Sequence, residues 1–461
     1  MKHRGLLRLI AGLYLMTAAF GVYPVYAQPS FDISEEVKKE EEKKPTEDRL
    51  GRPILLDGET GILIEQQSGM ILYESGGNKR MYPASTTKIM TALLAIEAVK
   101  RGEIGMDEPI TVTAEMLEGL DPDGSNIALK ADEVLTLKHL LWGLMIPSGN
   151  DAAMAIAYRL AGSQEAFAER MNQRAREIGL SDTHFMNPHG LHDENHYTTA
   201  ADMAKMARAA MMYEEFREIV DIAHVKIPPT NKTEKERYYI NTNGLLSAMR
   251  YLDYVYKGAT GIKTGRTTEA GTCLVASATR NGMSLIAVVF HAVDTHDSHQ
   301  EAARMLDYGF EHFEAIRGIS RGELLGECKV RRARKKDTVA LAAAEDVMVV
   351  VPKGTPKSEL EVRLNLPEKL YAPLSEGQVV ASATVLYQGQ ELGTGNLGAL
   401  TQVKRSFFWP MMALGEWLWG FALIRGIVYV FFALVAAVVF LFLRGIWLEW
   451  KRIRRRSRRR R

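Results

Sequence analysis

The chain has 461 residues, 46% of them hydrophobic and 25% charged, with a formal net charge of +2 at pH 7. This length exceeds a single ordinary hydrophobic core and predicts two or more domains that are mostly globular. Residues 444–461 carry ten Lys or Arg and one Glu, so the remainder is mildly acidic, which argues against general nucleic-acid binding.

The segments ahead of the first helix indicate an exported protein. Residues 1–27 combine a basic start, an apolar stretch and a small residue, Ala27, after which we expect cleavage. They predict a signal peptide, with a short uncleaved anchor as the alternative. Residues 28–52 are rich in Glu and Lys and predict a charged flexible linker. Folded structure is expected from Pro53, beginning with a β-hairpin that turns at Gln67-Ser68-Gly69.

Ser85 stands three residues before Lys88, at the head of the apolar run 89–96. The run contains no Pro or Gly and predicts a buried helix. Positions i and i+3 share a helix face, so Lys88 can reach the Ser85 hydroxyl. Pro83 places Ser85 in the first turn, where the helix end favours negative charge. Apolar surroundings would lower the lysine pKa, and a neutral lysine can activate a serine, although the pattern alone also fits a solvated lysine.

A second polar segment interrupts the helical pattern of residues 135–161. Pro147 ends the first helix, and Ser148, Asn150 and Asp151 are good N-cap residues for the next one. The segment is either a capped turn between helices or a polar loop whose Ser148 and Asn150 project into a cleft.

The segment His184–His196 lies between helices expected at 164–178 and 198–212 and holds four histidines among Asp and Glu. Such a set invites a metal-site interpretation. However, Pro188 and Gly190 prevent a regular helical face of histidines. We therefore predict a surface loop with hydrogen-bonded histidines and no metal.

A third polar segment, Lys263-Thr264-Gly265, precedes two apolar runs, 274–279 and 284–291, that are joined by Asn281-Gly282. Asn-Gly between such runs is a strong hairpin signal, so the segment is predicted on or just before an antiparallel strand. Its glycine would let another backbone approach closely.

A helix is expected over 298–315, and the short apolar runs of 316–404, separated by Pro- and Gly-containing turns, predict a small all-β domain. The two cysteines do not form a disulfide framework. Cys273 lies in an apolar, strand-like run and predicts a buried thiol. Cys328 and the basic stretch 329–336 are expected on a solvated strand or turn.

The C-terminal end predicts a membrane anchor. Residues 405–425 form an apolar, aromatic segment that suits a membrane interface, and 426–443 contain no charge at all. At about 1.5 Å per residue the uncharged run spans roughly 27 Å, close to a bilayer core. The basic tail 444–461 would stay cytoplasmic, which places the preceding domains outside. A buried core helix is the alternative.

The three polar segments occur in one order, in the contexts of a helix, a loop and a strand. Together with Asn195–Ala200 and Gly261–Gly265 followed by Ala270-Gly271, they resemble the serine D-alanyl-D-alanine carboxypeptidases, the low-molecular-mass penicillin-binding proteins. The resemblance implies an α+β fold: a β-lactamase/transpeptidase-like domain over 53–315, with helices on an antiparallel sheet, then a small all-β domain over 316–404 and a C-terminal transmembrane helix.

The resemblance also implies the catalytic roles. Ser85 would be the nucleophile that forms an acyl-enzyme, Lys88 its general base, and Ser148 the relay of a proton to the leaving amine. The backbone N–H groups of Ser85 and Arg266 would form the oxyanion hole. The residues implied to bind substrate are Asn150, Lys263, Thr264, Gly265 and Arg266. Among these, Lys263 and Thr264 would hold the terminal carboxylate of the peptide.

The implied substrate is a peptidoglycan stem peptide ending in D-Ala-D-Ala, and β-lactams would be covalent inhibitors. No cofactor or metal is expected, because a Ser-Lys pair performs acyl transfer unaided. No nucleic-acid partner is expected either, because a membrane-bound basic tail is explained by topology and anionic lipid. Two alternatives remain open: a β-lactamase or esterase on the same fold, and a non-enzymatic β-lactam sensor. The domain architecture departs from the family in ending with a full span and a basic tail.

Overall fold

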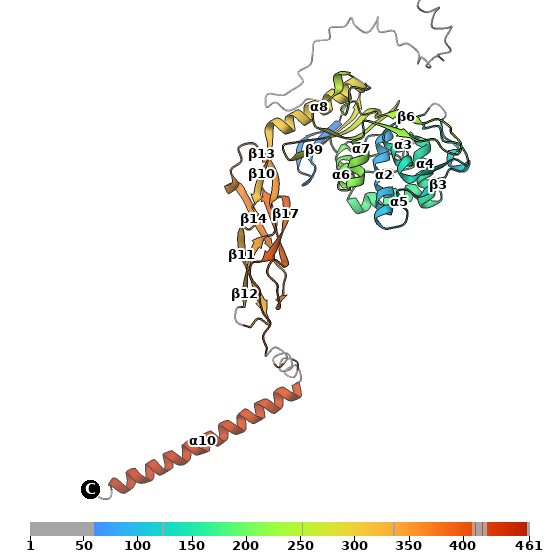
Figure 1. The fold of residues 1–461 in the computed structure, drawn as a ribbon. Coiled ribbons are helices and arrows are strands. Elements are labelled where there is room, and N and C mark those ends of the chain that lie inside the picture. Colours follow the sequence, from blue (N-terminus) through green and yellow to red (C-terminus); the bar gives the residue numbers. More distant parts are fainter. Residues whose placement is uncertain are drawn as a thin grey trace, which may run out of the picture. The chain divides into compact units, whose positions relative to one another are not determined.

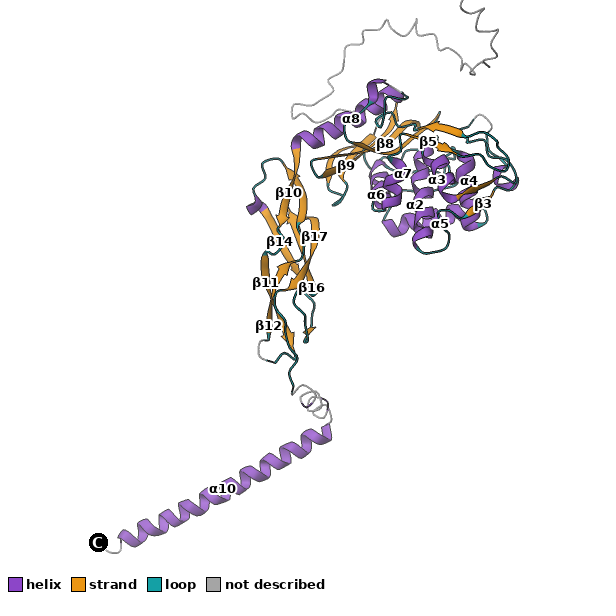
Figure 2. Ribbon diagram, viewed as in Figure 1, coloured by secondary structure: helices purple, strands orange, loops and turns teal. Residues whose placement is uncertain are grey.

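The computed structural model describes residues 60–121, 124–250, 252–334, 337–407, 411, 417 and 422–458. The predicted signal peptide, the linker and the start at Pro53 lie outside the described residues, as does most of the predicted interfacial segment 405–425. The described chain forms an α+β domain, a β-domain and a long C-terminal helix (Figures 1 and 2).

The first domain is built on a five-stranded antiparallel sheet in the order β2-β1-β9-β8-β7. Its strands are β1 (Thr60–Glu65), β2 (Ile71–Ser75), β7 (Ala259–Thr267), β8 (Gly271–Arg280) and β9 (Met283–Ala292). Both predicted hairpins, β1-β2 and β8-β9, are confirmed. The predicted strand that carries Lys263-Thr264-Gly265 is β7, which forms one edge of the sheet.

Alternate residues of the central strands enter two separate cores. In β9, Ile286 and Val288 pack with the helices on one face, whereas Leu285 and Ala287 pack with the opposite face and α8. Successive side chains of a strand point to opposite faces, so a strand covered on both sides is apolar throughout. This explains why the sequence showed continuous apolar runs here rather than an alternating pattern.

The helices of this domain are α2 (Lys88–Lys100), α3 (Leu137–Met145), α4 (Asn150–Ala161), α5 (Gln164–Ile178), α6 (Ala200–Met211), α7 (Glu214–Val220) and α8 (Thr295–His312), with 3₁₀ turns η1 (Ala84–Thr87), η2 (Glu115–Leu117) and η3 (Leu252–Tyr254). Helices α2 to α6 and α8 correspond to predicted helices, whereas α7 was not predicted. Helix α2 is buried from Lys88 to Ala98 and contacts α3, α4, α5, α6 and α7. Two small hairpins, β3 (Pro109–Thr111) with β4 (Val134–Thr136) and β5 (His224–Ile227) with β6 (Arg237–Ile240), were not predicted.

Helix α8 differs from the predicted helix over 298–315 at both ends. Asp294 caps its start, since its side chain accepts a hydrogen bond from the Asp297 N–H, so the helix begins at Thr295. Phe313 is extended and pairs with Pro352, so residues 313–315 belong to a strand. Pairing with a distant strand is not visible in a local helical pattern.

The β-domain, residues 313–406, confirms the all-β prediction. It contains β10 (Phe313–Ile319), β11 (Leu324–Arg331), β12 (Thr338–Ala343), β13 (Val347–Pro352), β14 (Leu360–Asn365), β15 (Leu370–Tyr371), β16 (Val379–Tyr387) and β17 (Gln390–Ala399), with the 3₁₀ turn η4 (Lys357–Glu359). Its sheets have the orders β10-β13 and β14-β16-β17-β12-β11-β15.

Cys328 lies on β11 as a buried residue, which corrects the expectation of a solvated position, whereas Cys273 is buried as predicted. Both thiols are free.

Helix α10 (Ala422–Arg458) contains the predicted uncharged run. Its segment Arg425–Arg452 is long and apolar enough to cross a membrane, with a mean hydropathy of 2.9 in its most apolar window. That window is not buried by other parts of the described chain, so the alternative of a buried core helix receives no support.

Candidate active site

The structure places Lys88 beside Ser85, as the helical spacing predicts. Ser85 lies in the 3₁₀ turn η1, which leads directly into α2 at Lys88. The Lys88 Nζ atom is 2.8 Å from Ser85 Oγ, 2.7 Å from Asn150 Oδ1 and 2.8 Å from the His189 carbonyl oxygen. The lysine side chain is fully buried.

Burial holds the pKa of Lys88 well below its usual value, and the nearby charge of Lys263 lowers it further, while Asp151 acts in the opposite direction. A neutral lysine amine has two N–H donors and one lone pair. The Asn150 Oδ1 and His189 carbonyl oxygens can only accept, so they take the two donors. The lone pair then faces the remaining neighbour, the Ser85 hydroxyl, and is positioned to take its proton.

The histidine-rich segment supplies part of this arrangement. Gly190 has a φ of +88°, and a Cβ there would lie 1.8 Å from the Ala84 carbonyl oxygen, so only glycine lets the segment pack against the serine turn. This contact brings the His189 carbonyl to Lys88. Nearby, His196 Nε2 lies 2.9 Å from Thr87 Oγ1.

The same contacts correct the prediction of a surface loop. His189 and His196 are buried, and burial lowers the pKa of each to about 3, so both are neutral at physiological pH. Among the described residues, no group of His, Cys, Asp or Glu is arranged to hold a metal ion.

The second polar segment forms the opposite wall. Ser148 follows α3 with a φ of +73°, an uncommon conformation for a residue other than glycine. Its Oγ is buried and has no hydrogen-bond partner among the described residues. A buried hydroxyl is costly without a hydrogen-bond partner, so this atom is available to bond a ligand or a water molecule.

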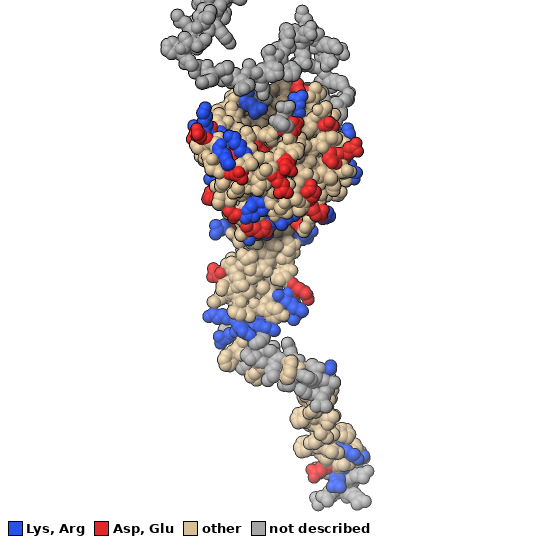
Figure 3. Space-filling view, turned by 90° about the vertical axis from the view of Figure 1, so that its right-hand side faces the viewer, with Lys and Arg blue, Asp and Glu red and all other residues tan. Residues whose placement is uncertain are grey.

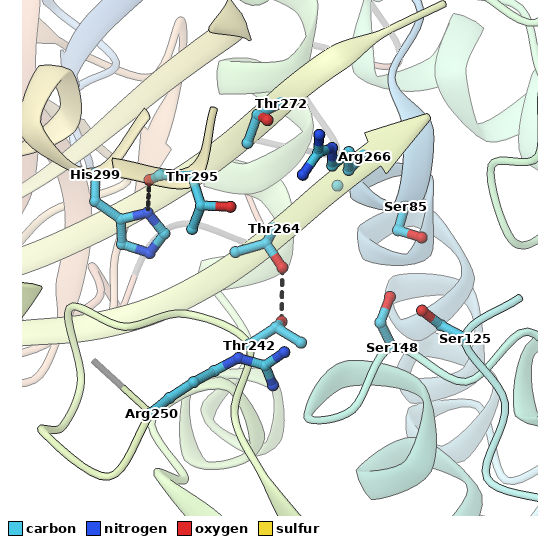
Figure 4. Close-up of a pocket in the computed structure, with 11 residues that line it drawn as sticks. Ser85, Ser125, Ser148, Thr242, Arg250, Thr264, Arg266, Thr272, Thr295 and His299 are labelled. Atoms are coloured by element: carbon cyan, nitrogen blue, oxygen red, sulfur yellow. Dashed lines mark hydrogen bonds between the residues drawn. The ribbon is translucent and has the colours of Figure 1, made fainter. Parts of the chain in front are cut away.

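Asp151 fixes this wall to the neighbouring chain. Its carboxylate accepts hydrogen bonds from the backbone N–H groups of Ile127, Leu129 and Ala152 at 2.9–3.0 Å. The Asn150 N–H donates to the Ser125 carbonyl at 2.7 Å. These bonds place Ser125 next to Ser148, a neighbour that the sequence analysis did not identify (Figure 4).

Strand β7 forms the third wall. Lys263 is buried, its Nζ donates to the Thr264 carbonyl at 2.9 Å, and burial together with Arg250 lowers its pKa to about 7. The Thr264 hydroxyl lies 2.6 Å from that of Thr242. A Cβ on Gly265 would lie 2.9 Å from the Ser85 backbone nitrogen, so the predicted close approach of a second backbone is present.

These walls enclose a cavity of about 170 Å³ (Figure 4). The predicted site residues that line it are Ser85, Ser148, Thr264, Gly265 and Arg266. Lys88, Asn150 and Lys263 are buried and do not line it. The lining residues that sequence reasoning missed are Ser125, Thr242, Arg250, Thr272, Thr295 and His299.

Of the missed residues, Ser125 lies beside Ser148, whereas Arg250, Thr295 and His299 lie on the side of the cavity away from Ser85 (Figure 4). His299 Nε2 accepts a hydrogen bond from the Gly244 N–H at 3.1 Å, and its Nδ1 lies 2.7 Å from the Thr295 carbonyl. The imidazole thus fastens the chain before Arg250 to α8. Since no Asp or Glu is among the described residues that line the cavity and two arginines are, the site favours an anionic group.

Comparisons with known proteins agree with this geometry. A family model described as D-alanyl-D-alanine carboxypeptidase matches residues 48–294, and the model of the penicillin-binding protein 5 C-terminal domain matches residues 313–405. The D-alanyl-D-alanine carboxypeptidase DacF of Bacillus subtilis is 33% identical over 363 residues, covering 78% of this chain and 90% of DacF. DacA of Haemophilus influenzae is 33% identical over 353 residues, covering 76% of this chain and 86% of DacA.

Solved structures show the same likeness. Penicillin-binding protein 5 from Haemophilus influenzae has a TM-score of 0.59 and 33% identity, covering 75% of this chain and 97% of that one. A protein of Streptococcus pneumoniae described as a peptidoglycan synthesis regulatory factor, PBP3, has a TM-score of 0.65 at 25% identity, covering 75% of this chain and 98% of that one.

Proposed function

The chain belongs to the D-alanyl-D-alanine carboxypeptidase family and is a serine-type D-alanyl-D-alanine carboxypeptidase. From this premise we propose how its residues catalyse the reaction. The substrate is a peptidoglycan stem peptide ending in D-Ala-D-Ala. The observation that carries the assignment is the Ser85 hydroxyl 2.8 Å from a buried lysine amine whose other two neighbours can only accept hydrogen bonds.

In the first step Ser85 Oγ attacks the carbonyl carbon of the penultimate D-alanine and its proton passes to Lys88 Nζ. The oxyanion is stabilised by the backbone N–H groups of Ser85 and Arg266. The intermediate collapses by breaking the C–N bond, and Ser148 relays a proton to the departing D-alanine amine. Water then cleaves the ester, which releases the shortened peptide and restores Ser85.

The terminal carboxylate of the peptide is held at the cationic end of the cavity. Sequence reasoning assigned this task to Lys263 with Thr264. Lys263 is buried behind the surface of β7, whereas the two arginines line the cavity, so we add Arg250 and Arg266 to the groups that attract the carboxylate. Asn150 orients Lys88, and Gly265 keeps β7 close to the serine turn.

The same cavity would accept a β-lactam, whose carbonyl replaces that of the scissile peptide bond and acylates Ser85. Efficient β-lactam hydrolysis by a class A mechanism uses a Glu-activated water for deacylation. No carboxylate is among the described residues that line the cavity. This observation favours the carboxypeptidase over the β-lactamase.

We propose that α10 anchors the enzyme in the cell membrane, with residues 444–461 cytoplasmic and the domains at 53–315 and 316–404 outside. The proposal is supported by the apolar segment Arg425–Arg452 and by the basic residues that follow the uncharged run. Export would be directed by residues 1–27, with 28–52 as a linker and 405–425 lying at the interface.

The test is release of D-alanine from a stem pentapeptide by the full-length chain in detergent, beside the variant Ser85→Ala. We expect release by the wild-type enzyme alone, together with stoichiometric labelling of Ser85 by a fluorescent penicillin. Rapid, multiple turnover of penicillin without D-alanine release would overturn the assignment in favour of a β-lactamase. Labelling of Ser85 by penicillin without penicillin turnover and without D-alanine release would favour a sensor.

A further inference from the structure

A group of basic side chains lies at the end of the β-domain from which the chain continues toward α10. We call it the basic band and define it by Lys329, Arg331, Arg332, Arg334, Lys404 and Arg405. All six are exposed. Figure 3 shows a group of Lys and Arg side chains at one end of this domain.

Two separate stretches of chain are joined to make the band. The Arg334 N–H donates to the Lys404 carbonyl at 3.0 Å, and the Ser406 N–H donates to the Arg332 carbonyl at 2.8 Å. Ala333 and Arg405 form an antiparallel bridge between the same stretches. The fold therefore brings the end of β11 and the departing chain side by side and concentrates their positive charge.

The segment that carries most of the band is rich in basic residues and poor in acidic ones. Residues 329–337 contain six Lys or Arg and one acid, Asp337. In the described part of the β-domain, no ion pair joins Lys329, Arg331, Arg334 or Lys404 to a carboxylate. Like charges gathered on one surface repel each other, so an external anion would be attracted to it.

Aromatic side chains accompany the basic ones. Phe407 lies two residues after Arg405 and is 85% exposed, and Tyr371 is 40% exposed with the Arg332 guanidinium 4.5 Å from its ring centroid. Aromatic and basic residues occur together where proteins meet the headgroup region of a bilayer. A soluble polyanion would not require the exposed Phe407.

The band is also tied to the membrane by a short length of chain. Nineteen residues lie between Arg405 and Arg425, where the apolar segment of α10 begins. Even fully extended they reach no more than about 70 Å. Such a tether keeps the band at a high effective concentration near the bilayer, so weak contacts suffice for binding.

We propose that the basic band binds the anionic phospholipid headgroups of the bilayer that α10 spans. Binding would hold this end of the β-domain against the membrane surface and restrict its motion relative to the anchor. The inference rests on the proposed membrane topology and not on the roles proposed for the active-site residues.

The test uses the full-length chain in two kinds of nanodisc, one of phosphatidylcholine alone and one with one-third phosphatidylglycerol. A water-soluble acylating reagent modifies exposed lysines, and mass spectrometry gives the rate at each. We expect modification of Lys329 and Lys404 to slow several-fold in the anionic discs and to recover in 1 M salt. Lys353, exposed elsewhere on the β-domain, serves as the internal reference with equal rates.

A double variant, Arg331→Glu with Arg334→Glu, should remove the difference between the discs and leave D-alanine release from a soluble pentapeptide unchanged. Lys353→Glu is the matched control and should keep the difference. Equal rates for the wild-type chain in both discs would overturn the proposal, as would protection that appears only after adding a soluble anionic wall polymer. A chain that does not copurify with either disc would contradict the proposed anchor itself, an outcome distinct from equal rates.

Discussion

Replacement of Gly265 by alanine tests the geometry of the oxyanion hole. The added Cβ would lie 2.9 Å from the Ser85 nitrogen, 3.0 Å from the Thr86 nitrogen and 3.1 Å from Ala84 Cβ. Carbon atoms in contact prefer about 3.5–4.0 Å, and two of these neighbours are backbone atoms that cannot rotate away. The serine turn must therefore move by several tenths of an ångström, which displaces the Ser85 N–H from the developing oxyanion. Removal of one oxyanion donor costs about 10²–10³ in kcat, so we expect a loss of that order.

The assay follows acylation of Gly265→Ala by a fluorescent penicillin and its release of D-alanine, with thermal unfolding measured in parallel. Gly105→Ala is the matched control, because the nearest atom to its added Cβ is 3.8 Å away and its φ is not positive. The control should acylate at the wild-type rate. A folded Gly265→Ala enzyme that acylates as fast as the wild type would refute the reasoning, since the close approach would then have no part in catalysis.

Three further predictions concern the charges of the site. Because the carboxylate of the peptide is attracted by protonated Lys263, whose pKa is about 7, kcat/KM for the pentapeptide should fall as pH rises through that value, whereas a substrate ending in a carboxamide should show no such fall. Asn150→Ala removes one of the acceptors of neutral Lys88, so the acylation rate should drop about 2- to 10-fold, as for a hydrogen bond of roughly 0.5–1.5 kcal/mol, while Asn150→Asp should shift the pH profile upward by charging the lysine. Arg250→Ala should raise KM for the pentapeptide about tenfold with little change in kcat, and should leave KM for the carboxamide substrate unchanged. Arg250→Lys should raise KM for the pentapeptide less than Arg250→Ala does.

The parts of the site that the sequence predicted are those fixed by local geometry. A spacing of three residues in a helical turn brings Lys88 to Ser85 regardless of the rest of the fold, and the structure has the pair at 2.8 Å. The break at Pro147 between two helices likewise placed Ser148 at the end of α3. The need for glycine at position 265 was also readable, because a strand interior tolerates glycine poorly without a reason.

The parts that the sequence did not predict depend on the backbone or on long-range packing. The acceptor that His189 offers to Lys88 is a carbonyl group, which every residue has, so its side chain gave no signal and suggested metal binding instead. The only local indication was Gly190. Arg250 and His299 lie in segments without a recognisable motif, and a long-range hydrogen bond from the Gly244 N–H to His299 joins these segments at the cavity. The strand start at Phe313 depends in the same way on its pairing with Pro352, 39 residues further along the chain.

The two buried lysines of the site differ in their surroundings. Burial lowers the pKa of both lysines, and the charge of Lys263 lowers the pKa of Lys88 further. The hydrogen-bond partners of Lys88 are also all satisfied by a neutral amine. When two titratable groups share a site, the environment that separates their pKa values assigns their roles. We infer that Lys88, whose surroundings suit a neutral amine, is the member that acts as the base. The pKa of Lys263 is about 7, and a bound carboxylate would favour its charged form. Substrate binding therefore reinforces the charge on one lysine, and that charge opposes protonation of the other before Ser85 reacts.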